Sequence, residues 1–337
     1  MSTSRVVLIA LFVAVGTAFV IPAAGQVPPC AVTTTWSFQP PPPPPAPAPN
    51  PPIPIVYPSI TAALNSAPAT LLGGTVFVSG VCTEPEIFIT ERFINLTLIG
   101  NGVPGTQATL QGASAPLGGA LSIRGRNITV RGFKITSAGA KYGVTVYRGG
   151  TGLIDNCVID GFTGGGITVN QWAFARIVNN TVQNNGEEGI FVAESAAVRV
   201  GFASTDDPAP QPNTIRNNGL AGIRVTRMAD ARITANVITG NGEAGIAVEN
   251  NSHADIAWND LSGNNGAGVR VHLNSTARVG IGSGRADWDI PNSTTTPNLG
   301  AGLECTLGRA VEGTLGTLTG LEGSQQFGHG CMHDLTR

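Results

Sequence analysis

Glycine-led segments at a nearly fixed spacing constrain the fold of this chain more than any other feature. Six related segments, GITV, GIFV, GIRV, GIAV, GVRV and GLEC, begin at Gly166, Gly189, Gly222, Gly245, Gly268 and Gly302. Their spacings are 23, 33, 23, 23 and 34 residues, so a 23-residue unit twice carries an extra ten or eleven. Gly143 and Ala120 keep the period toward the N-terminus. Such a period predicts a solenoid, in which each unit buries its apolar face only by stacking on its neighbours.

The unit that begins at Gly245 predicts short β-strands and leaves no room for a helix. Ile246 and Val248 alternate with outward residues, which indicates a strand with one buried face. Ile256 is the next buried position, and residues 263–266 (GNNG) close the unit with residue types that tolerate positive φ. Three short strands per unit would form a triangular coil, and stacked coils would pair as parallel strands about 4.8 Å apart.

Two columns of equivalent residues are expected inside the coils. The first is an aliphatic stack eleven residues after each glycine, formed by Ile154, Ile177, Val200, Ile233, Ile256 and Val279. The second lies three residues further on and holds Asn180, Asn213, Asn236 and Asn259, with Cys157 one coil earlier. Stacked amides can hydrogen-bond from coil to coil, so we interpret this column as structural.

Composition and the N-terminus predict an exported, folded protein. Apolar residues make up 42% of the chain and the net charge is −2, which excludes a disordered chain and gives no basic footprint for nucleic acid. Residues 1–25 read as a signal peptide, with Arg5, an apolar run over 6–20 and a small-residue cleavage site at 22–25. An N-terminal membrane anchor that is not removed would need about 18 or more consecutive apolar residues, and the run here is shorter. We therefore expect a secreted, cell-surface or periplasmic monomer with no membrane span after signal removal.

The rest of the chain divides into three expected parts. Residues 26–56 form an N-terminal segment with a proline-rich linker, because the run over 40–54 favours extended polyproline II. This linker is either a stalk or a joint without a specific role. Residues 57–310 form the solenoid, and 311–337 form a C-terminal cap or tail.

The repeats resemble those of right-handed parallel β-helix proteins in the pectin lyase-like superfamily. The residues that carry the resemblance are GITV at 166–169, IVNNTV at 177–182, and the N-terminal stretches 57–64, 74–78 and 96–100. The resemblance implies an all-β, single-stranded right-handed parallel β-helix with 23-residue coils and an N-terminal helical cap, for which Ser59 can serve as the N-cap. The superfamily contains lyases, hydrolases, epimerases and non-enzymatic surface proteins, so the resemblance specifies the fold and leaves the function open.

Five cysteines in an exported chain leave one unpaired. Cys157 lies in the inward column and is the expected free thiol. Cys30 and Cys82 lie near the start of the solenoid and Cys305 and Cys331 near its end, so we predict the bridges Cys30–Cys82 and Cys305–Cys331. Bridges there would pin both ends of the stack.

No metal site or cofactor is predicted. His329, Cys331 and His333 alternate, but their spacing is not a zinc pattern and a fourth ligand is not evident. Calcium is the one ion to consider in a polysaccharide-acting relative, and no set of adjacent coils supplies clustered aspartates for it.

The first candidate site lies on the outward face of the glycine-led strands. Charged residues gather there on successive coils, namely Arg224, Glu249, Arg270, His272 and Glu304. In the polysaccharide-acting members of the superfamily this face is commonly the substrate groove, so these residues are the candidates for catalysis. The alternative is a surface sheet whose opposite charges pair between neighbouring strands.

A second outward row stands ten residues after each glycine. It holds Arg176, Arg199, Arg232, Asp255 and Arg278. Three stacked arginines repel one another unless they splay into solvent or meet an anion. A uronic-acid polymer supplies regularly spaced carboxylates that arginine can bind in bidentate fashion. The alternative is splaying, with Asp255 offsetting its two arginine neighbours.

The two insertions, at 201–212 and 280–292, occur at the same point of their coils. They should emerge as two lobes on one side, three coils apart. Trp258, Asp287, Trp288 and Asp289 lie between or on these lobes and could form a sugar-binding cleft, because loops on a rigid scaffold often carry function. The alternative is loop variation without function.

These observations favour an exported protein that binds extracellular or cell-wall polysaccharide, with catalysis not evident. Two other functions stay open. One is a lyase, hydrolase or epimerase acting on uronate-containing glycan, and the other is a non-enzymatic structural or adhesive surface protein.

Overall fold

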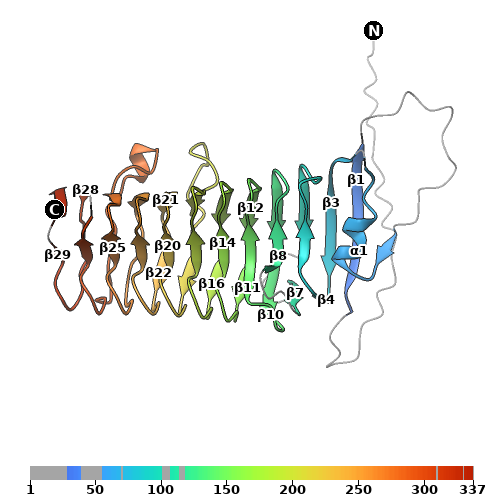
Figure 1. Cartoon of the computed structure of the whole chain (residues 1–337), viewed down its shortest axis with the longest axis horizontal. Helices are drawn as coiled ribbons and strands as arrows, with labels where there is room; N and C mark the ends of the chain where they lie inside the picture. Colours follow the sequence, from blue (N-terminus) through green and yellow to red (C-terminus); the bar gives the residue numbers. More distant parts are fainter. Residues whose placement is uncertain are drawn as a thin grey trace, which may run out of the picture.

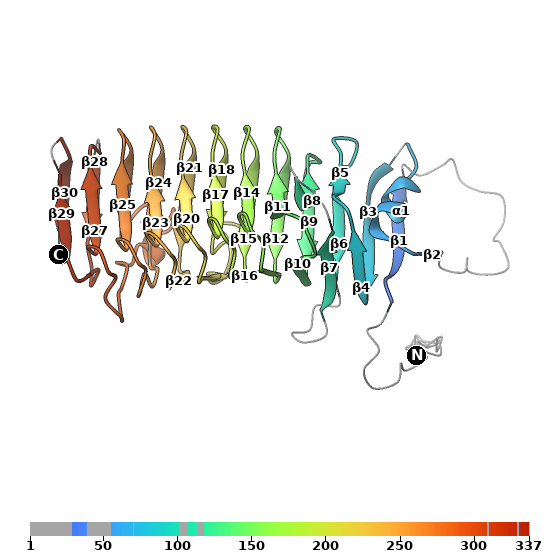
Figure 2. The same cartoon turned by 60° about the horizontal axis from the view of Figure 1, so that its bottom comes forward.

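A computed structural model describes residues 29–38, 55–69, 71–100, 107–113, 118–308, 310–328 and 330–336. The expected signal peptide and the proline run lie outside these residues. The described chain winds into an elongated solenoid whose coils stack along one axis (Figure 1). Three β-sheets run along this axis, and within each sheet the strands of successive coils are neighbours (Figure 2). The all-β solenoid predicted from the period is confirmed.

Sheet C contains the glycine-led strands. In spatial order its strands are β5 (Ile87–Ile89), β8 (Gly119–Ile123), β11 (Tyr142–Val146), β14 (Ile167–Val169), β17 (Ile190–Val192), β20 (Ile223–Val225), β23 (Ile246–Val248), β25 (Val269–His272), β27 (Leu303–Thr306) and β29 (Gln325–Phe327). All of these pair in parallel with the registers that the period requires, for example Ile223 with Ile246.

Sheet B follows sheet C within each coil and carries the second outward row. Its parallel strands are β3 (Leu71–Ser79), β6 (Leu96–Ile99), β9 (Ile128–Arg131), β12 (Thr151–Asp155), β15 (Phe174–Val178), β18 (Ala197–Val200), β21 (Asp230–Thr234), β24 (His253–Ala257), β26 (Thr276–Val279), β28 (Ala310–Thr314) and β30 (Met332–Thr336). At the N-terminal end β1 (Ala31–Phe38) pairs antiparallel with β3 and with β2 (Val56–Tyr57). Parallel pairing thus continues past residue 310, since β30 pairs with β28.

Sheet A closes each triangle. Its strands are β4 (Val81–Glu84), β7 (Ala108–Gly112), β10 (Phe133–Ser137), β13 (Val158–Asp160), β16 (Thr181–Gln183), β19 (Thr214–Arg216) and β22 (Val237–Thr239). The aliphatic stack from Ile154 to Val279 lies fully buried inside sheet B, as predicted. The long apolar column explains why the chain needs many coils, because each coil covers the next.

Two asparagine ladders line the interior. The predicted one runs through Asn180, Asn213, Asn236 and Asn259 and extends to Asn292, and each side-chain amide donates to the next Oδ1 over 2.8–3.0 Å. A second one, not predicted, runs through Asn185, Asn218, Asn241, Asn264 and Asn298 over 2.9–3.1 Å. The second ladder explains the glycine period. A Cβ on Gly222 would lie 2.8 Å from the Asn241 amide and 2.4 Å from Ile238 Cγ2, so only glycine fits there.

Both ends of the solenoid are tied by disulfides. Cys30–Cys82 and Cys305–Cys331 form as predicted, with S–S distances of 2.04 and 1.97 Å. Cys157 is the free buried cysteine, and burial raises the pKa of its thiol to about 12, which makes it unreactive.

The helix α1 (Ile60–Asn65) lies at the N-terminal end, and the Ser59 hydroxyl accepts a hydrogen bond from Ala62 N at 3.0 Å (Figure 1). Among the described residues, no helix is both long and apolar enough to cross a membrane.

Candidate functional site

The charged residues predicted on sheet C pair with one another. Arg224 reaches three carboxylates, those of Glu188 at 3.2 Å, Glu243 at 2.5 Å and Glu249 at 3.8 Å. Arg270 pairs with Glu304 at 3.1 Å. Each charge therefore meets an opposite charge on a neighbouring coil, as in a surface sheet whose strands are joined by cross-strand ion pairs.

His272 also has a partner in this set. Its Nδ1 lies 2.6 Å from the backbone oxygen of Thr306 on the next strand of sheet C. The ring is therefore held between two coils, and it contacts no carboxylate within ion-pair distance among the described residues. The predicted catalytic candidates share a face, but their geometry is that of cross-strand support.

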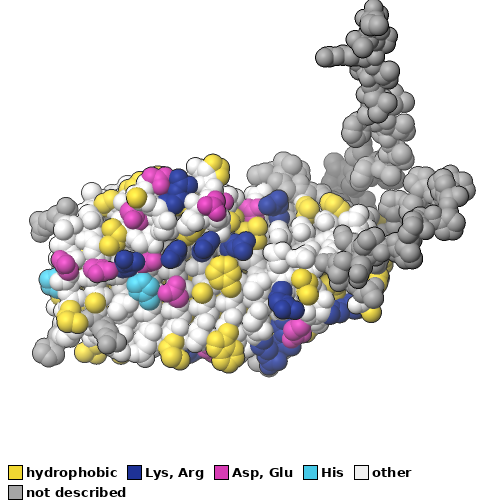
Figure 3. Space-filling view, turned by 90° about the horizontal axis from the view of Figure 1, so that it is seen from above, with side chains coloured by type: hydrophobic (Ala, Val, Ile, Leu, Met, Phe, Trp, Pro, Cys, Tyr) yellow, Lys and Arg dark blue, Asp and Glu magenta, His cyan; other side chains and the backbone are white. Residues whose placement is uncertain are grey.

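The outward row of sheet B differs, because two of its arginines have no carboxylate partner. The row runs Arg176, Arg199, Arg232, Asp255, Arg278, Glu312 and Asp334 on successive strands. Among the described residues, no carboxylate lies within 4.0 Å of Arg176 or Arg199. We call Arg176, Arg199 and Arg232 the arginine row. Figure 3 shows basic side chains in a line along this face, followed by acidic ones toward the C-terminal end.

The environment of Arg199 reflects this crowding of like charges. Burial of the guanidinium, followed by the charges of Arg232 and Arg176, lowers the pKa of Arg199, while the charges of Asp207 and Asp206 on the first lobe act in the opposite direction. Its Nη1 donates to Ala203 O at 3.2 Å, which fixes the side chain against the first lobe. Arg176 lies over the ring of Phe174 at 5.8 Å. Among the described residues no carboxylate lies within 4.0 Å of either guanidinium, so both keep N–H donors that a ligand can use.

The C-terminal half of the row is neutralised around Asp255. Arg232 Nε lies 3.5 Å and Arg278 Nη1 3.7 Å from its carboxylate, and Arg278 Nε also pairs with Glu312 at 3.0 Å. The predicted offset by Asp255 therefore holds for Arg232 and Arg278. It does not reach Arg199 and Arg176, which lie one and two coils beyond Arg232.

The two lobes emerge where predicted but do not form an open cleft. Arg285 of the second lobe donates to Asp207 O of the first at 2.6 Å, and the rings of Phe202 and Trp288 make an edge contact at 5.7 Å. Trp288 is only 3% exposed, so its ring is not open to solvent as a surface on which a sugar could stack. The contact between the lobes closes the space that a cleft would need and buries the ring.

The acidic residues of the second lobe have structural partners. Asp289 accepts hydrogen bonds from Ser283 N and Oγ at 2.9 and 2.8 Å, and Asp287 pairs with Arg285 at 2.5 Å. Trp258 remains 40% exposed beside this lobe. The joined lobes thus form a wall along one edge of the arginine row, since Gly284 approaches both Arg232 and Thr205.

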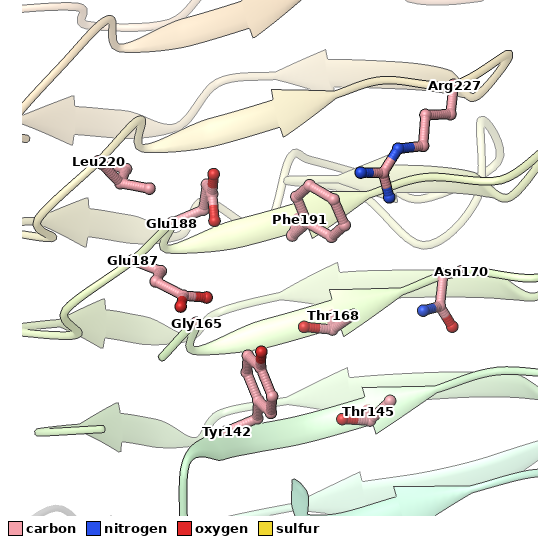
Figure 4. Close-up of a pocket in the computed structure, with 10 residues that line it drawn as sticks. All are labelled: Tyr142, Thr145, Gly165, Thr168, Asn170, Glu187, Glu188, Phe191, Leu220 and Arg227. Atoms are coloured by element: carbon pink, nitrogen blue, oxygen red, sulfur yellow. The ribbon is translucent and has the colours of Figure 1, made fainter. Parts of the chain in front are cut away.

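A groove of about 470 Å³ on sheet C was not predicted. The lining includes Tyr142, Glu187, Glu188, Phe191 and Arg227, and Figure 4 shows these side chains spread over successive strands of the sheet. Burial, with the nearby charges of Glu187 and Glu243 and against that of Arg224, raises the pKa of Glu188. Sequence reasoning missed the pair Glu187-Glu188 because it lies just before Gly189, outside the strand pattern. The position of this acidic pair directly before a repeat glycine is the signal that was available.

The described residues offer one close group of possible metal ligands, and these atoms have other roles. The group is Cys30, Cys82 and Glu84. The two sulfurs are bonded to each other, and the Glu84 carboxylate accepts from Ile60 N and Thr61 N at 2.7 and 2.9 Å. These donors are the free N–H groups of the first turn of α1, so Glu84 stabilises the helix.

Solved structures with a similar architecture have low sequence identity to this chain. The A-module of the mannuronan C-5 epimerase AlgE6 from Azotobacter vinelandii is 17% identical, with a TM-score of 0.40 over 82% of this chain and 95% of that one. The periplasmic alginate epimerase AlgG is 11% identical, with a TM-score of 0.42 over 79% and 86%. At these values the likeness carries no information on activity. A comparison with curated proteins gives no match.

The sequence also matches a family model, described as the right-handed β-helix region, over residues 111–204 and 206–280. The two segments together make up half of the chain and contain the regular coils of all three sheets. The chain therefore belongs to the right-handed β-helix family.

Proposed function

We propose that this chain is an exported protein that binds acidic polysaccharide along the arginine row of sheet B. The observation that carries the proposal is the pair Arg176 and Arg199, whose guanidinium groups have no carboxylate partner within 4.0 Å among the described residues. Neighbouring strands lie about 4.8 Å apart, which is comparable with the length of one pyranose residue. A polyuronate lying along the solenoid axis would therefore offer one carboxylate to each coil.

The surroundings of the row support a chain-like ligand rather than a small anion. The row spans three coils, Phe174 adds an aromatic ring beside Arg176, and the joined lobes form a wall along one edge. Arginine binds carboxylates in bidentate fashion, and each charged hydrogen bond contributes about 1.5–3 kcal/mol.

Titration with polyuronate and with a neutral glucan of similar length tests the proposal. The wild-type protein should bind the polyuronate and not the glucan, and Arg176→Gln with Arg199→Gln should weaken binding at least about a hundredfold. Arg131→Gln is the matched control, because Arg131 lies on the same sheet but is paired with Asp155 at 2.7 Å. Equal affinity of the double variant and the wild type would contradict the proposal.

The groove on sheet C favours a second function, that of an enzyme acting on glycan. Phe191 offers a ring on which a sugar can stack, and Glu188 has the raised pKa expected of a general acid. Release of reducing ends or unsaturated uronates that is abolished in Glu188→Gln would support this function. Absence of any such release from uronate-containing glycans would exclude it.

A further inference from the structure

Three polar side chains on sheet B form a hydrogen-bonded series outside the arginine row. Thr276 Oγ1 lies 2.8 Å from His253 Nδ1, and His253 Nε2 lies 3.1 Å from Asp255 Oδ1. Thr276 and His253 are neighbours on paired strands, while Asp255 follows His253 by two residues on the same outward face. A hydroxyl, an imidazole and a carboxylate are thus connected in the order that an activated nucleophile requires.

The hydrogen bonds are consistent with one neutral tautomer of His253. If Nε2 carries the proton, it donates to the Asp255 carboxylate, and Nδ1 then accepts from the Thr276 hydroxyl. Asp255 is buried and lies within ion-pair distance of Arg232 and Arg278, which fix its carboxylate in place against the ring. Thr276 and His253 are partly exposed, so a substrate can reach both.

Two of the three groups, His253 and Thr276, border a hollow of about 350 Å³. Its lining includes His253, Thr276, Arg278, Ala310 and Glu312. Ala310 is the neighbour of Thr276 on the next strand, and its small side chain leaves room above the hydroxyl. Arg278 brings a guanidinium into the same hollow, where it can stabilise an oxyanion.

We propose that Thr276, His253 and Asp255 form a catalytic triad that removes acyl ester groups from sugar hydroxyls. The Thr276 oxygen attacks the ester carbonyl while its proton moves to His253 Nδ1. The ester C–O bond then breaks, the sugar oxygen takes that proton, and the acyl group remains on Thr276. Water, losing a proton to His253, attacks the acyl carbon, and Thr276 recovers its proton as the carboxylic acid leaves.

The position of the triad indicates its substrate class. Asp255 belongs to the same outward row as Arg176, Arg199 and Arg232, so the hollow lies at the end of the arginine row. A polyuronate bound along that row would place its next residues at Thr276. The substrate is therefore an O-acylated acidic polysaccharide, and this part of the inference rests on the proposed function.

Hydrolysis of p-nitrophenyl acetate tests the triad without any polysaccharide. The wild-type protein should release nitrophenol, and Thr276→Ala and His253→Gln should each lower the rate by at least about a hundredfold. Thr276→Ser should retain activity, whereas Thr129→Ala, on the same face but remote from the hollow, should match the wild type. A fluorophosphonate probe should label Thr276 and leave Thr276→Ala unlabelled, with circular dichroism confirming that each variant is folded.

A second assay separates the triad from the arginine row. Acetate release from O-acetylated polyuronate should be lost in Thr276→Ala with binding intact, and should fall in Arg176→Gln with Arg199→Gln because binding is lost. Hydrolysis of p-nitrophenyl acetate in the absence of polyuronate binding would overturn the proposed function and leave the triad standing. A wild-type rate no faster than that of Thr276→Ala, or a label on another residue, would overturn the triad.

Discussion

Sheets B and C carry rows of charged side chains built on the same period, but opposite charges pair along sheet C, whereas the N-terminal part of the row on sheet B holds arginines without a carboxylate partner among the described residues. On sheet C each arginine meets a carboxylate on a neighbouring coil, as Arg224 does with Glu188 and Arg270 with Glu304. On sheet B, Arg176 and Arg199 lie next to another arginine. The stacking of coils determines only which residues become neighbours. The residue type at one outward position of each coil then determines whether the row forms ion pairs within the solenoid or keeps charged groups that a ligand could bind.

The largest expected effect is a loss of affinity for polyuronate when an acidic residue is placed among the arginines of sheet B, as on sheet C. Arg199→Glu would place a carboxylate between Arg176 and Arg232 and pair it with both. Affinity for polyuronate should fall by about a hundredfold or more, because a charged hydrogen bond is lost and a repulsive charge is gained. Titration by calorimetry would measure this, and undiminished affinity would show that the row is not the binding surface.

Removing the cation from the sheet C network should instead affect folding. Arg224→Gln leaves Glu188, whose side chain is 8% exposed, close to Glu243 without a compensating charge. We expect a loss of about 2–3 kcal/mol in the free energy of unfolding, with polyuronate binding unchanged. Denaturant titration gives the first value, and a stable variant with weakened binding would reverse the roles assigned to the two sheets.

A more exposed pair on the same sheet should matter less. Arg270→Gln removes the ion pair with Glu304, in which the two side chains are 31% and 25% exposed. The expected cost is below about 1 kcal/mol, because partly solvated pairs contribute little. Comparing this variant with Arg224→Gln in one denaturation series would show whether burial sets the strength of these pairs.

The smallest expected effect is a dependence of stability on pH. The folded-state pKa of Glu188 is raised above its ordinary value of 4.5, so the folded protein holds this proton more tightly than the unfolded chain does. The stability contributed by Glu188 is therefore fully present below pH 4.5 and is lost as the pH rises through the raised pKa. Glu188→Gln should flatten the profile in that window, and an unchanged profile would assign the dependence to another group.

The parts of the molecule that repeat could be predicted from the sequence, and the parts that do not repeat could not. Ile177 and Asn180 could be assigned to inward columns because the register of parallel strands follows directly from the period. The burial of Trp288 could not be predicted, because it depends on a contact with Phe202. These two residues lie in separate insertions, three coils apart, whose sequences do not follow the repeat. Whether the charged residues of the outward rows form ion pairs could not be predicted either, because ion pairing depends on side-chain conformations that the sequence alone does not give.

The candidate site shows the same division. The membership of the arginine row was predicted, and its register is confirmed. The groove on sheet C was missed because Glu187 and Glu188 lie in a turn, and the link from Thr276 to His253 was missed because it joins two residues that are uncharged or weakly charged. Turns and hydroxyls carry no periodic signal, so only their positions in space bring them together.

The two disulfides have a consequence for how the molecule comes apart. Hydrogen bonds in all three sheets run from coil to coil. A terminal coil has a neighbour on one side only, so a solenoid without further links unfolds from its ends. Cys30–Cys82 and Cys305–Cys331 join each terminal segment to a neighbouring coil, and so remove the two places where unravelling would begin. The lifetime of the folded chain is then limited by the rate at which a middle coil unfolds. Reduction of the two disulfides would allow faster unfolding to begin at the terminal coils.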